Sequence, residues 1–284
     1  MKRLLAVLAA CTPLVLLAAC AGDGGPASGD LGASCTRESL QTLSPGRLVV
    51  AVGQPAYEPW VRNDKPEGGE GFEAAVAHAA AERLGFSAQD LRWVRTTASE
   101  ALAPGPKPFD WSLQQHTITP VREAFVDFSA PYLALGHAVV SYEGSPIEDA
   151  RAVADLAGAR MGAVTGSDGR QVAQRLAVAG PDVAVFRDTA EAVAALSDRT
   201  VDGLVLDLRT AFSVVAGQVD DGVIVGQVPA SRGGTAEEIG ILLGQGSPLT
   251  ACTSRAIEAL RADGTLDRLA QVWLAERGGA PVLS

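Results

Sequence analysis

The chain has 284 residues, of which 47% are hydrophobic, and a formal net charge of -10 at pH 7. Once about forty leading residues are set aside, this length allows two modest domains, on a prior of roughly 100–200 residues each. An acidic chain has no footprint for nucleic acid or for anionic lipid, so neither is expected as a partner. After the first twenty residues, no apolar run approaches the roughly 20 residues of a membrane span, so we expect a soluble, globular body.

The N-terminus has the form of an export signal. A basic pair, Lys2 and Arg3, precedes an apolar run that ends in small residues at Ala18 and Ala19. The cysteine that follows makes the segment resemble a bacterial lipoprotein signal, in which Cys20 becomes the lipidated first residue. We therefore expect a signal peptide at residues 1–19, a tether and N-terminal segment at 20–44, and a lipid-anchored protein outside the cytoplasm. An ordinary secretory signal with an incidental cysteine is the alternative.

Four cysteines are present in the chain. Cys11 leaves with the signal and Cys20 carries the lipid, so Cys35 and Cys252 remain as an even pair in an oxidising compartment. A disulfide between them is expected, with two buried free thiols as the alternative. No metal or cofactor is expected, because the three histidines share no ligand spacing with each other or with the cysteines: His78, His116 and His137.

Apolar runs and helical spacing alternate along the body, which predicts α/β units and a largely parallel sheet. Strands are predicted at 48–52, 91–94, 138–142, 160–164, 183–186, 203–206 and 239–243. Helices are predicted over 72–84, within 147–156, through 172–177, and over 191–196, 249–262 and 266–275. Gly85 is the expected C-cap of the first helix and Thr265 the expected N-cap of the last.

The segment Thr117–Arg122 holds the sharpest candidate for ligand contact. Thr119 and Pro120 are typical of a helix start. Arg122 would then lie in the first turn, where the helix dipole disfavours a cation. Such an arginine either reaches solvent or has an anionic partner, and its planar guanidinium fits a carboxylate bidentately. These residues alone do not decide between a surface arginine and a carboxylate clamp.

Five motifs occur in one order along the body. They are Gly71–Glu73 before an Ala-rich helix, Thr117–Arg122, Val126–Ser129 with Pro131–Tyr132, Val201–Asp207 and Gly246–Leu249. Together they resemble the extracellular solute-binding proteins of family 3, which serve ABC importers of polar amino acids, over about residues 45–276. The resemblance implies a two-lobed α/β fold of the type II periplasmic-binding-protein kind, with a ligand cleft between lobes and a hinge crossed twice. Lobe one would take residues 45–135 and 237–284, and lobe two residues 136–236.

The resemblance also implies how the two charged ends of an amino acid would be held. Arg122 would clamp the α-carboxylate beside Thr117, and Ser167 would offer its hydroxyl and backbone amide to the same group. Asp207 would hold the α-ammonium group. Each has a plainer interpretation, because Ser167 could only shape a turn and Asp207 could only cap a helix.

The ligand side chain would lie against aromatic and amide groups. Tyr57 matches an aromatic residue that packs over the side chain, with Trp60 beside it, although both could be rim or core aromatics. Gln115, or equally Gln114 or His116, would face the side chain and favour a polar or amide ligand. The plainer interpretation of His116 is a hydrogen-bonded core imidazole.

The expected function is capture of a polar amino acid by a monomer that is not an enzyme and that delivers its cargo to an ABC permease. Gln54 stands where relatives for basic ligands can carry an acid, which disfavours lysine or arginine, although Glu58 and Asp168 remain nearby. Arg209 replaces a proline common after the ammonium-binding acid and receives no role. The alternatives are an exported enzyme similar to cyclohexadienyl dehydratases, recruiting Glu58 or His116, and a ligand-binding partner of a sensor.

Overall fold

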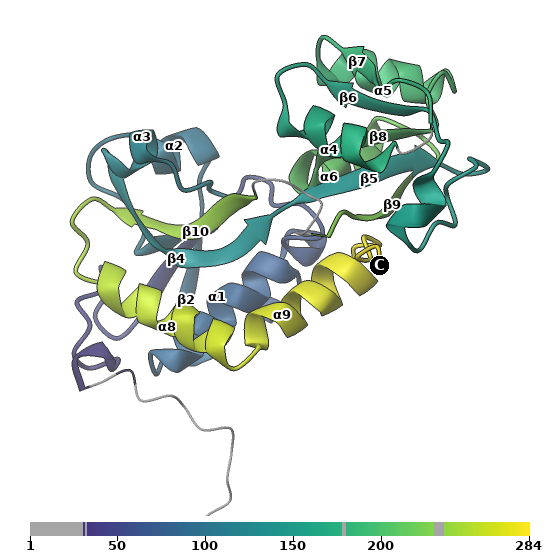
Figure 1. The fold of residues 1–284 in the computed structure, drawn as a ribbon. Helices are drawn as coiled ribbons and strands as arrows, with labels where there is room; N and C mark the ends of the chain where they lie inside the picture. Colours follow the sequence, from purple (N-terminus) through teal and green to yellow (C-terminus); the bar gives the residue numbers. More distant parts are fainter. Residues whose placement is uncertain (1–30, 32, 178–179, 230–235) are drawn as a thin grey trace, which may run out of the picture.

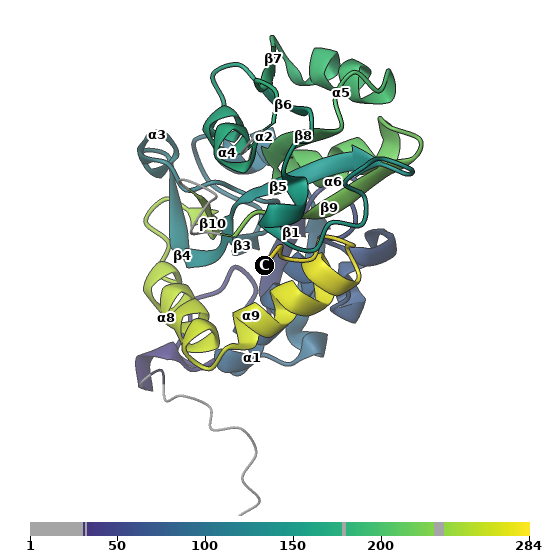
Figure 2. The same cartoon turned by 45° about the vertical axis from the view of Figure 1, so that its right-hand side comes forward.

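The computed structural model describes residues 31, 33–177, 180–229 and 236–284. They form two lobes, each built on a five-stranded sheet with helices packed against it (Figures 1 and 2). The predicted two-lobed α/β fold is therefore confirmed. The expected signal peptide and the lipidation site at Cys20 lie outside the described residues. Within the described ranges, no helix combines the length and the apolar character needed to cross a membrane.

The first lobe contains a sheet of strand order β2-β1-β3-β10-β4. β1 runs parallel to β2 and β3, whereas β10 runs antiparallel to β3 and β4. The strands are β1 (Leu48–Val52), β2 (Leu91–Arg95), β3 (Trp111–Ser112), β4 (Val126–Leu135) and β10 (Glu237–Gly244). The helices are α1 (Phe72–Arg83), α2 (Ala98–Leu102), α3 (Pro120–Glu123), α8 (Thr250–Ala262) and α9 (Thr265–Ala270).

β1 is buried along its whole length because both faces of the sheet are covered. Leu48 and Val50 pack in the core with α1 and α8, while Val49 and Ala51 pack in a second cluster with Ala101 of α2. Alternate side chains of a strand point to opposite faces, so a continuous apolar run is what such a strand needs. Figure 1 shows α1, α8 and α9 below the sheet and α2 and α3 above it.

The second lobe contains a sheet of strand order β7-β6-β8-β5-β9. β6 runs parallel to β7 and β8, whereas β5 runs antiparallel to β8 and β9. The strands are β5 (His137–Tyr142), β6 (Met161–Val164), β7 (Ala184–Phe186), β8 (Gly203–Asp207) and β9 (Gly222–Gln227). The helices are α4 (Asp168–Leu176), α5 (Thr189–Ser197) and α6 (Leu208–Gly217).

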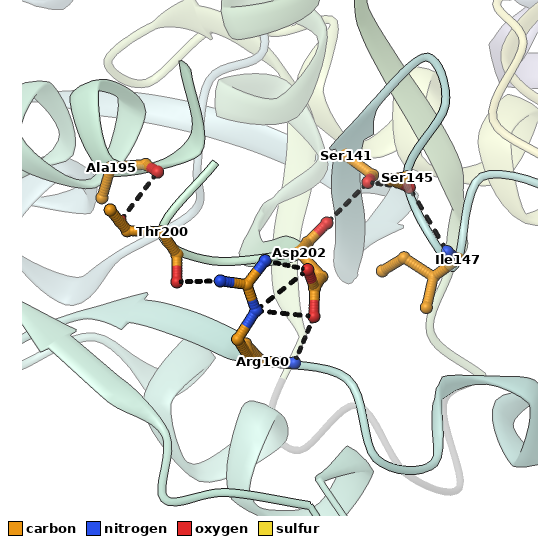
Figure 3. A network of polar contacts seen from close by, with 7 residues as sticks. All are labelled: Ser141, Ser145, Ile147, Arg160, Ala195, Thr200 and Asp202. Atoms are coloured by element: carbon orange, nitrogen blue, oxygen red, sulfur yellow. Dashed lines mark hydrogen bonds and ion pairs between the residues drawn. The ribbon is translucent and has the colours of Figure 1, made fainter. Parts of the chain in front are cut away.

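A polar network pins the start of β8 inside the second lobe (Figure 3). The Asp202 carboxylate accepts from the backbone N–H of Arg160 at 2.8 Å and from its guanidinium Nε at 3.1 Å. The Ser141 hydroxyl donates to the Asp202 carbonyl at 2.6 Å. Burial would raise the pKa of Asp202, but the bonds from Arg160 outweigh it and lower that pKa. The network therefore keeps a buried carboxylate charged.

Three local expectations need correction. Each sheet is mixed rather than largely parallel, because the strands that border the crossings between lobes run antiparallel to their neighbours. The short helix expected within 147–156 is a single 3-10 turn, Val153–Leu156. The last helix is capped by Gly264, which adopts a left-handed φ of 74°, and not by Thr265, whose N–H donates to the Asp263 side chain at 2.9 Å. That helix continues from Gln271 to Glu276 as a π-helical segment.

The chain passes between the lobes twice. Gly136 alone joins β4 to β5, and the return path runs from β9 to β10. The last residues, expected with the first lobe, hydrogen-bond to the second: Leu283 N–H donates to Gln227 O at 3.0 Å, and Ser284 N–H donates to Arg151 O at 3.0 Å. Leu283 is buried in the second-lobe core, so the chain end ties the two lobes together.

The predicted disulfide is confirmed. Cys35 and Cys252 are joined, with Cα atoms 5.4 Å apart and a sequence separation of 217. The bond fastens the N-terminal segment to α8 of the first lobe. The alternative of two free thiols is excluded.

Candidate functional site

A hollow of about 390 Å³ lies on the second lobe, at the carboxyl ends of β6 and β8; we call it the second-lobe hollow. Its lining includes Ser167 and Asp207 from this lobe, and Glu237 at the start of β10. In open α/β sheets, ligands bind outside the carboxyl ends of the strands. The structure thus brings two of the predicted ligand residues to one place of the expected kind.

Asp207 ends β8 and begins α6. Its Oδ1 accepts from the backbone N–H of Thr210 at 3.0 Å, so the helix-cap interpretation is confirmed. The second carboxylate oxygen has no hydrogen-bond partner among the described residues, and the side chain is 35% exposed. A cap uses one oxygen and leaves the other available to a ligand, so the two interpretations are compatible.

Ser167 lies in the turn between β6 and α4. Its hydroxyl donates to Val164 O at 2.7 Å and its N–H points to the same carbonyl at 3.3 Å. Gly166, with a φ of 72°, permits the tight turn. In this structure Ser167 therefore makes the contacts of a turn residue, and its exposed hydroxyl oxygen still borders the second-lobe hollow.

His137 is a hollow-lining residue that the sequence did not single out for ligand contact. It opens β5, pairs in register with Asp207, and is 7% exposed. Its Nδ1 is buried and has no hydrogen-bond partner within the described part of the chain. Only the antiparallel pairing of β5 with β8 brings this imidazole beside Asp207, and no local sequence pattern reports that pairing.

A second hollow, of about 250 Å³, lies in the first lobe; we call it the first-lobe hollow. Tyr57, Trp60 and Gln115 all line it, as predicted residues for one site should. Tyr57 is 68% exposed, whereas Trp60 is 5% exposed and packs edge-on against Phe72 and Phe212. Since Phe212 belongs to α6, Trp60 forms part of the contact between the lobes as well as part of the hollow.

Gln115 is held in an unusual conformation at the edge of this hollow. Its φ is 50°, in the left-handed region that residues other than glycine rarely adopt. Its N–H donates to the buried carboxylate of Glu73 at 2.7 Å, and its carbonyl accepts from Arg209 at 2.9 Å. Strain of this kind persists where surrounding bonds fix the backbone, which they do here on both sides of the residue.

Glu73 anchors the floor of the first-lobe hollow. It is 1% exposed and also accepts from the Gln115 side-chain amide and the Tyr132 hydroxyl. Burial raises the pKa of Glu73, although these hydrogen bonds oppose the shift. The sequence motif Gly71–Glu73 indicated the family, but it did not predict that Glu73 is a buried hydrogen-bond acceptor. Its donors, Gln115 and Tyr132, lie 42 and 59 residues away in sequence.

Arg122 and Thr117 line neither hollow, yet they are connected to both lobes. The α3 start is as predicted, with Thr119 as cap. Arg122 Nη1 donates to Thr117 O at 2.8 Å, and the Thr117 hydroxyl donates to Glu237 Oε2 at 3.0 Å. Glu237 also accepts from Arg209 Nη2 at 3.0 Å, and Arg209 Nε lies 3.9 Å from Asp207 Oδ1. A chain of contacts thus runs from Arg122 of the first lobe to Asp207 of the second.

The other two side-chain candidates differ in placement. Gln114 lines the first-lobe hollow, and its amide donates to Thr96 Oγ1 at 2.8 Å and to Ser112 Oγ at 3.0 Å. His116 is 2% exposed and pairs through Nε2 with Ser112 Oγ at 3.0 Å. Burial, reinforced by the charges of Arg122 and Arg209, lowers the pKa of His116 to about 3. His116 is therefore a neutral core imidazole, as its plainer interpretation held.

Residues 48–276 match the sequence model of a protein family described as "Bacterial extracellular solute-binding proteins, family 3". The chain belongs to this family. A probable histidine-binding protein of Neisseria gonorrhoeae is 24% identical, over 98% of this chain and 98% of its own length. An L-arginine-binding protein of Pseudomonas aeruginosa is 28% identical, over 80% of this chain and 87% of its own. As the resemblance implied, this family 3 protein is an extracytoplasmic solute-binding protein.

Solved structures agree on the fold. The L-cystine solute receptor of Neisseria gonorrhoeae, unliganded and open, matches with a TM-score of 0.53 and 23% identity, over 80% of this chain and 92% of that one. An ancestral cyclohexadienyl dehydratase matches with a TM-score of 0.54 and 20% identity, over 81% and 92%. Proteins of this fold therefore include a receptor and a dehydratase, while the curated relatives of this chain are named as binding proteins.

Proposed function

We propose that this protein captures an amino acid between its lobes and delivers it to the permease of an ABC importer. One observation supports the proposal: Arg122 of the first lobe and Asp207 of the second, which carry opposite charges, are connected through Thr117, Glu237 and Arg209. An amino acid offers one anion and one cation, which match a guanidinium and a carboxylate. Family membership and the names of the relatives support the same ligand class.

Each pole of the ligand has a proposed partner. The α-carboxylate takes the place of the Thr117 carbonyl at Arg122, with the hydroxyls of Thr117 and Ser167 beside it. The α-ammonium binds the open oxygen of Asp207. Charge-assisted hydrogen bonds of this kind contribute about 1.5–3 kcal/mol each. The side chain enters the first-lobe hollow, beside Tyr57, Trp60 and Gln115.

Closure of the lobes follows from this division of contacts. A ligand that binds groups of both lobes favours the closed form, because only that form makes both sets of bonds. We propose lobe boundaries at 45–135 with 237–284, and at 136–236, with the last few residues strapped across to the second lobe. We also propose that the protein is a monomer that is anchored to the membrane by a lipid at Cys20. In a fatty-acid labelling experiment, Cys20→Ser should abolish incorporation of the label.

The enzyme alternative needs an acid placed in the cleft, and neither candidate is so placed. His116 is buried, and a pKa of about 3 leaves it unprotonated near neutral pH. Glu58 borders a different hollow, together with Arg62 and Trp273, and accepts from the Asn63 N–H at 3.3 Å. The placement of these residues therefore favours binding over catalysis.

The test of the proposed function is a binding screen followed by one substitution. Thermal-shift measurements with the twenty L-amino acids identify a ligand, and calorimetry gives its affinity. Arg122→Ala should abolish binding and leave the circular dichroism spectrum and the unfolding midpoint near those of the wild type. Arg187→Ala, which removes an exposed arginine of the second lobe, is the matched control and should bind normally. An Arg122→Ala protein that titrates like the wild type would overturn the assignment.

A further inference from the structure

Arg209 is not among the residues that line either hollow, but its side chain bonds to a lining residue of each. It lies in the first turn of α6, and its guanidinium crosses from the second lobe to the first. Nη1 donates to the carbonyl of Gln115, which lines the first-lobe hollow, while Nη2 donates to Glu237, which lines the second-lobe hollow. A ligand with its charged poles in one hollow and its side chain in the other would pass this cation.

The position of Arg209 is fixed by the helix that carries it. Asp207 caps α6 at its first turn. Phe212, three residues after Arg209 and therefore on the same side of the helix, packs edge-on against Trp60 with ring centroids 6.0 Å apart. This side of α6 is thus docked on the first lobe at two points, one polar and one aromatic. The guanidinium is held between the lobes by that docking and by its own hydrogen bonds.

The first-lobe hollow has no free negative charge to receive a cationic side chain. Among the described residues that line it, Glu73 is the one carboxylate, and the polar remainder are neutral: Gln54, Tyr57, Thr97, Gln114 and Gln115. Glu73 is 1% exposed and already accepts three hydrogen bonds. A cationic ligand side chain in this hollow would therefore find no carboxylate free of protein partners, and the carboxylate that borders Arg209, that of Glu237, is already bonded to it.

We propose that Arg209 determines ligand specificity. The cleft takes amino acids whose side chain carries an oxygen acceptor, a carboxylate or a carboxamide, and rejects lysine-like and arginine-like side chains. A guanidinium has five N–H donors, and two of them make the bonds to Gln115 and Glu237, so donors remain for a ligand oxygen. Hydrogen bonds from a charged donor are the strong ones, which favours such a ligand over an apolar one. This inference rests on the proposed function and narrows its ligand class.

The test uses the mature protein and four probes: L-glutamate, L-glutamine, L-arginine and L-lysine. Calorimetry on the wild type should show at least about tenfold tighter binding of L-glutamate or L-glutamine than of either cationic probe. The first two probes distinguish a carboxylate from a carboxamide. Arg209→Met should weaken the binding of the preferred probe about tenfold or more. It should also bring the affinities for the preferred and the cationic probes closer together. Arg209→Lys, which keeps the charge, should retain most of the rejection of L-arginine and L-lysine.

Controls separate specificity from stability and from the proposed function. Arg187→Met removes an exposed arginine of the second lobe and should leave all four affinities unchanged. Tighter binding of L-arginine or L-lysine by the wild type overturns the inference. So does an Arg209→Met variant that weakens every probe by one factor, since that is what a purely structural role predicts. If the screen of the twenty L-amino acids finds binding of only an apolar one, the inference is overturned and the proposed function stands, whereas binding of no amino acid at all removes both.

Discussion

The two walls of the cleft are built from the same strand and helix units, yet they treat their polar groups in opposite ways. In the first lobe, the backbone groups of Gln115 and the carboxylate of Glu73 bond to protein partners. In the second lobe, Asp207 keeps one carboxylate oxygen without a partner among the described residues, and His137 keeps Nδ1 in the same condition. These polar groups of the first wall thus have hydrogen-bond partners within the protein, whereas those of the second wall keep atoms that a ligand can bond.

The difference indicates a division of work between the lobes. A buried polar group is costly unless it is hydrogen-bonded, so the first wall is a rigid platform that exists before a ligand arrives. The second wall keeps groups whose bonds can be completed by a ligand. Arg209 connects the two, because it belongs to the second lobe and completes a bond in the first. Substitution of the buried Glu73 should therefore affect stability most, and substitution of Asp207 should affect binding most.

The largest effect on stability is expected from Glu73→Ala. The substitution leaves the Gln115 amides and the Tyr132 hydroxyl without their buried acceptor, at about 1–3 kcal/mol for each unsatisfied group. The free energy of unfolding should fall by about 3–5 kcal/mol in urea titrations. Glu70→Ala removes an exposed carboxylate that pairs with Arg62 and should change it by less than about 1 kcal/mol. Equal effects of the two substitutions would show that the first wall is not the rigid one.

A change of pH is expected to have a smaller effect on the free energy of unfolding. The effect has opposite signs for Glu73 of the first lobe and Asp202 of the second. Burial raises the pKa of Glu73 above its usual 4.5, so its contribution to stability is complete below pH 4.5 and is lost as pH rises through the raised value. At Asp202, burial would raise the pKa, but the hydrogen bonds from Arg160 outweigh burial and lower it below 3.8. The contribution of Asp202 to stability is therefore present above pH 3.8 and is lost as pH falls through the lowered value.

Urea unfolding from pH 3 to 7 distinguishes these two carboxylates. The stability of Glu73→Gln relative to the wild type should increase as pH rises above 4.5. Asp202→Asn should be destabilising near neutral pH, by about 1–3 kcal/mol for the weakened buried pair, and its deficit should shrink as pH falls below 3.8. Parallel curves for the two variants would contradict the opposite pKa shifts of Glu73 and Asp202.

The sequence was sufficient for the elements whose signal is local. The buried run of β1, the Ala-rich α1 and the paired cysteines all follow from composition and spacing. β4 was not predicted, because Asp127, Ser129 and Pro131 interrupt its apolar pattern. Its partner β10 lies about a hundred residues further along the chain, so only the fold reveals the pairing. The mixed order of each sheet depends on such long-range pairings.

The candidate site divides in the same way. The resemblance supplied Asp207, Ser167, Tyr57 and the other residues by position, and the structure gathers them in two hollows and the contact chain between these. Arg209 had no role in the sequence, because its contacts with Gln115 and Glu237 join segments 94 and 28 residues away. A residue of this kind is found only when the two lobes are seen together.

The smallest effect on stability, with a large effect on binding, is expected from Asp207→Asn. Asparagine is as good an N-cap as aspartate, so the bond to the Thr210 N–H can be kept and the free energy of unfolding should change by less than about 0.5 kcal/mol. The negative charge is lost, however, and with it the proposed partner of the α-ammonium group. Calorimetry with the best ligand of the screen should show affinity at least about tenfold weaker, which corresponds to about 1.4 kcal/mol. Asp207→Ala should weaken binding similarly and also cost about 1 kcal/mol of stability through the lost cap. If the asparagine variant binds the ligand as tightly as the wild type, Asp207 does not provide the charge that holds the α-ammonium group. The proposed difference between the two lobes would then be wrong.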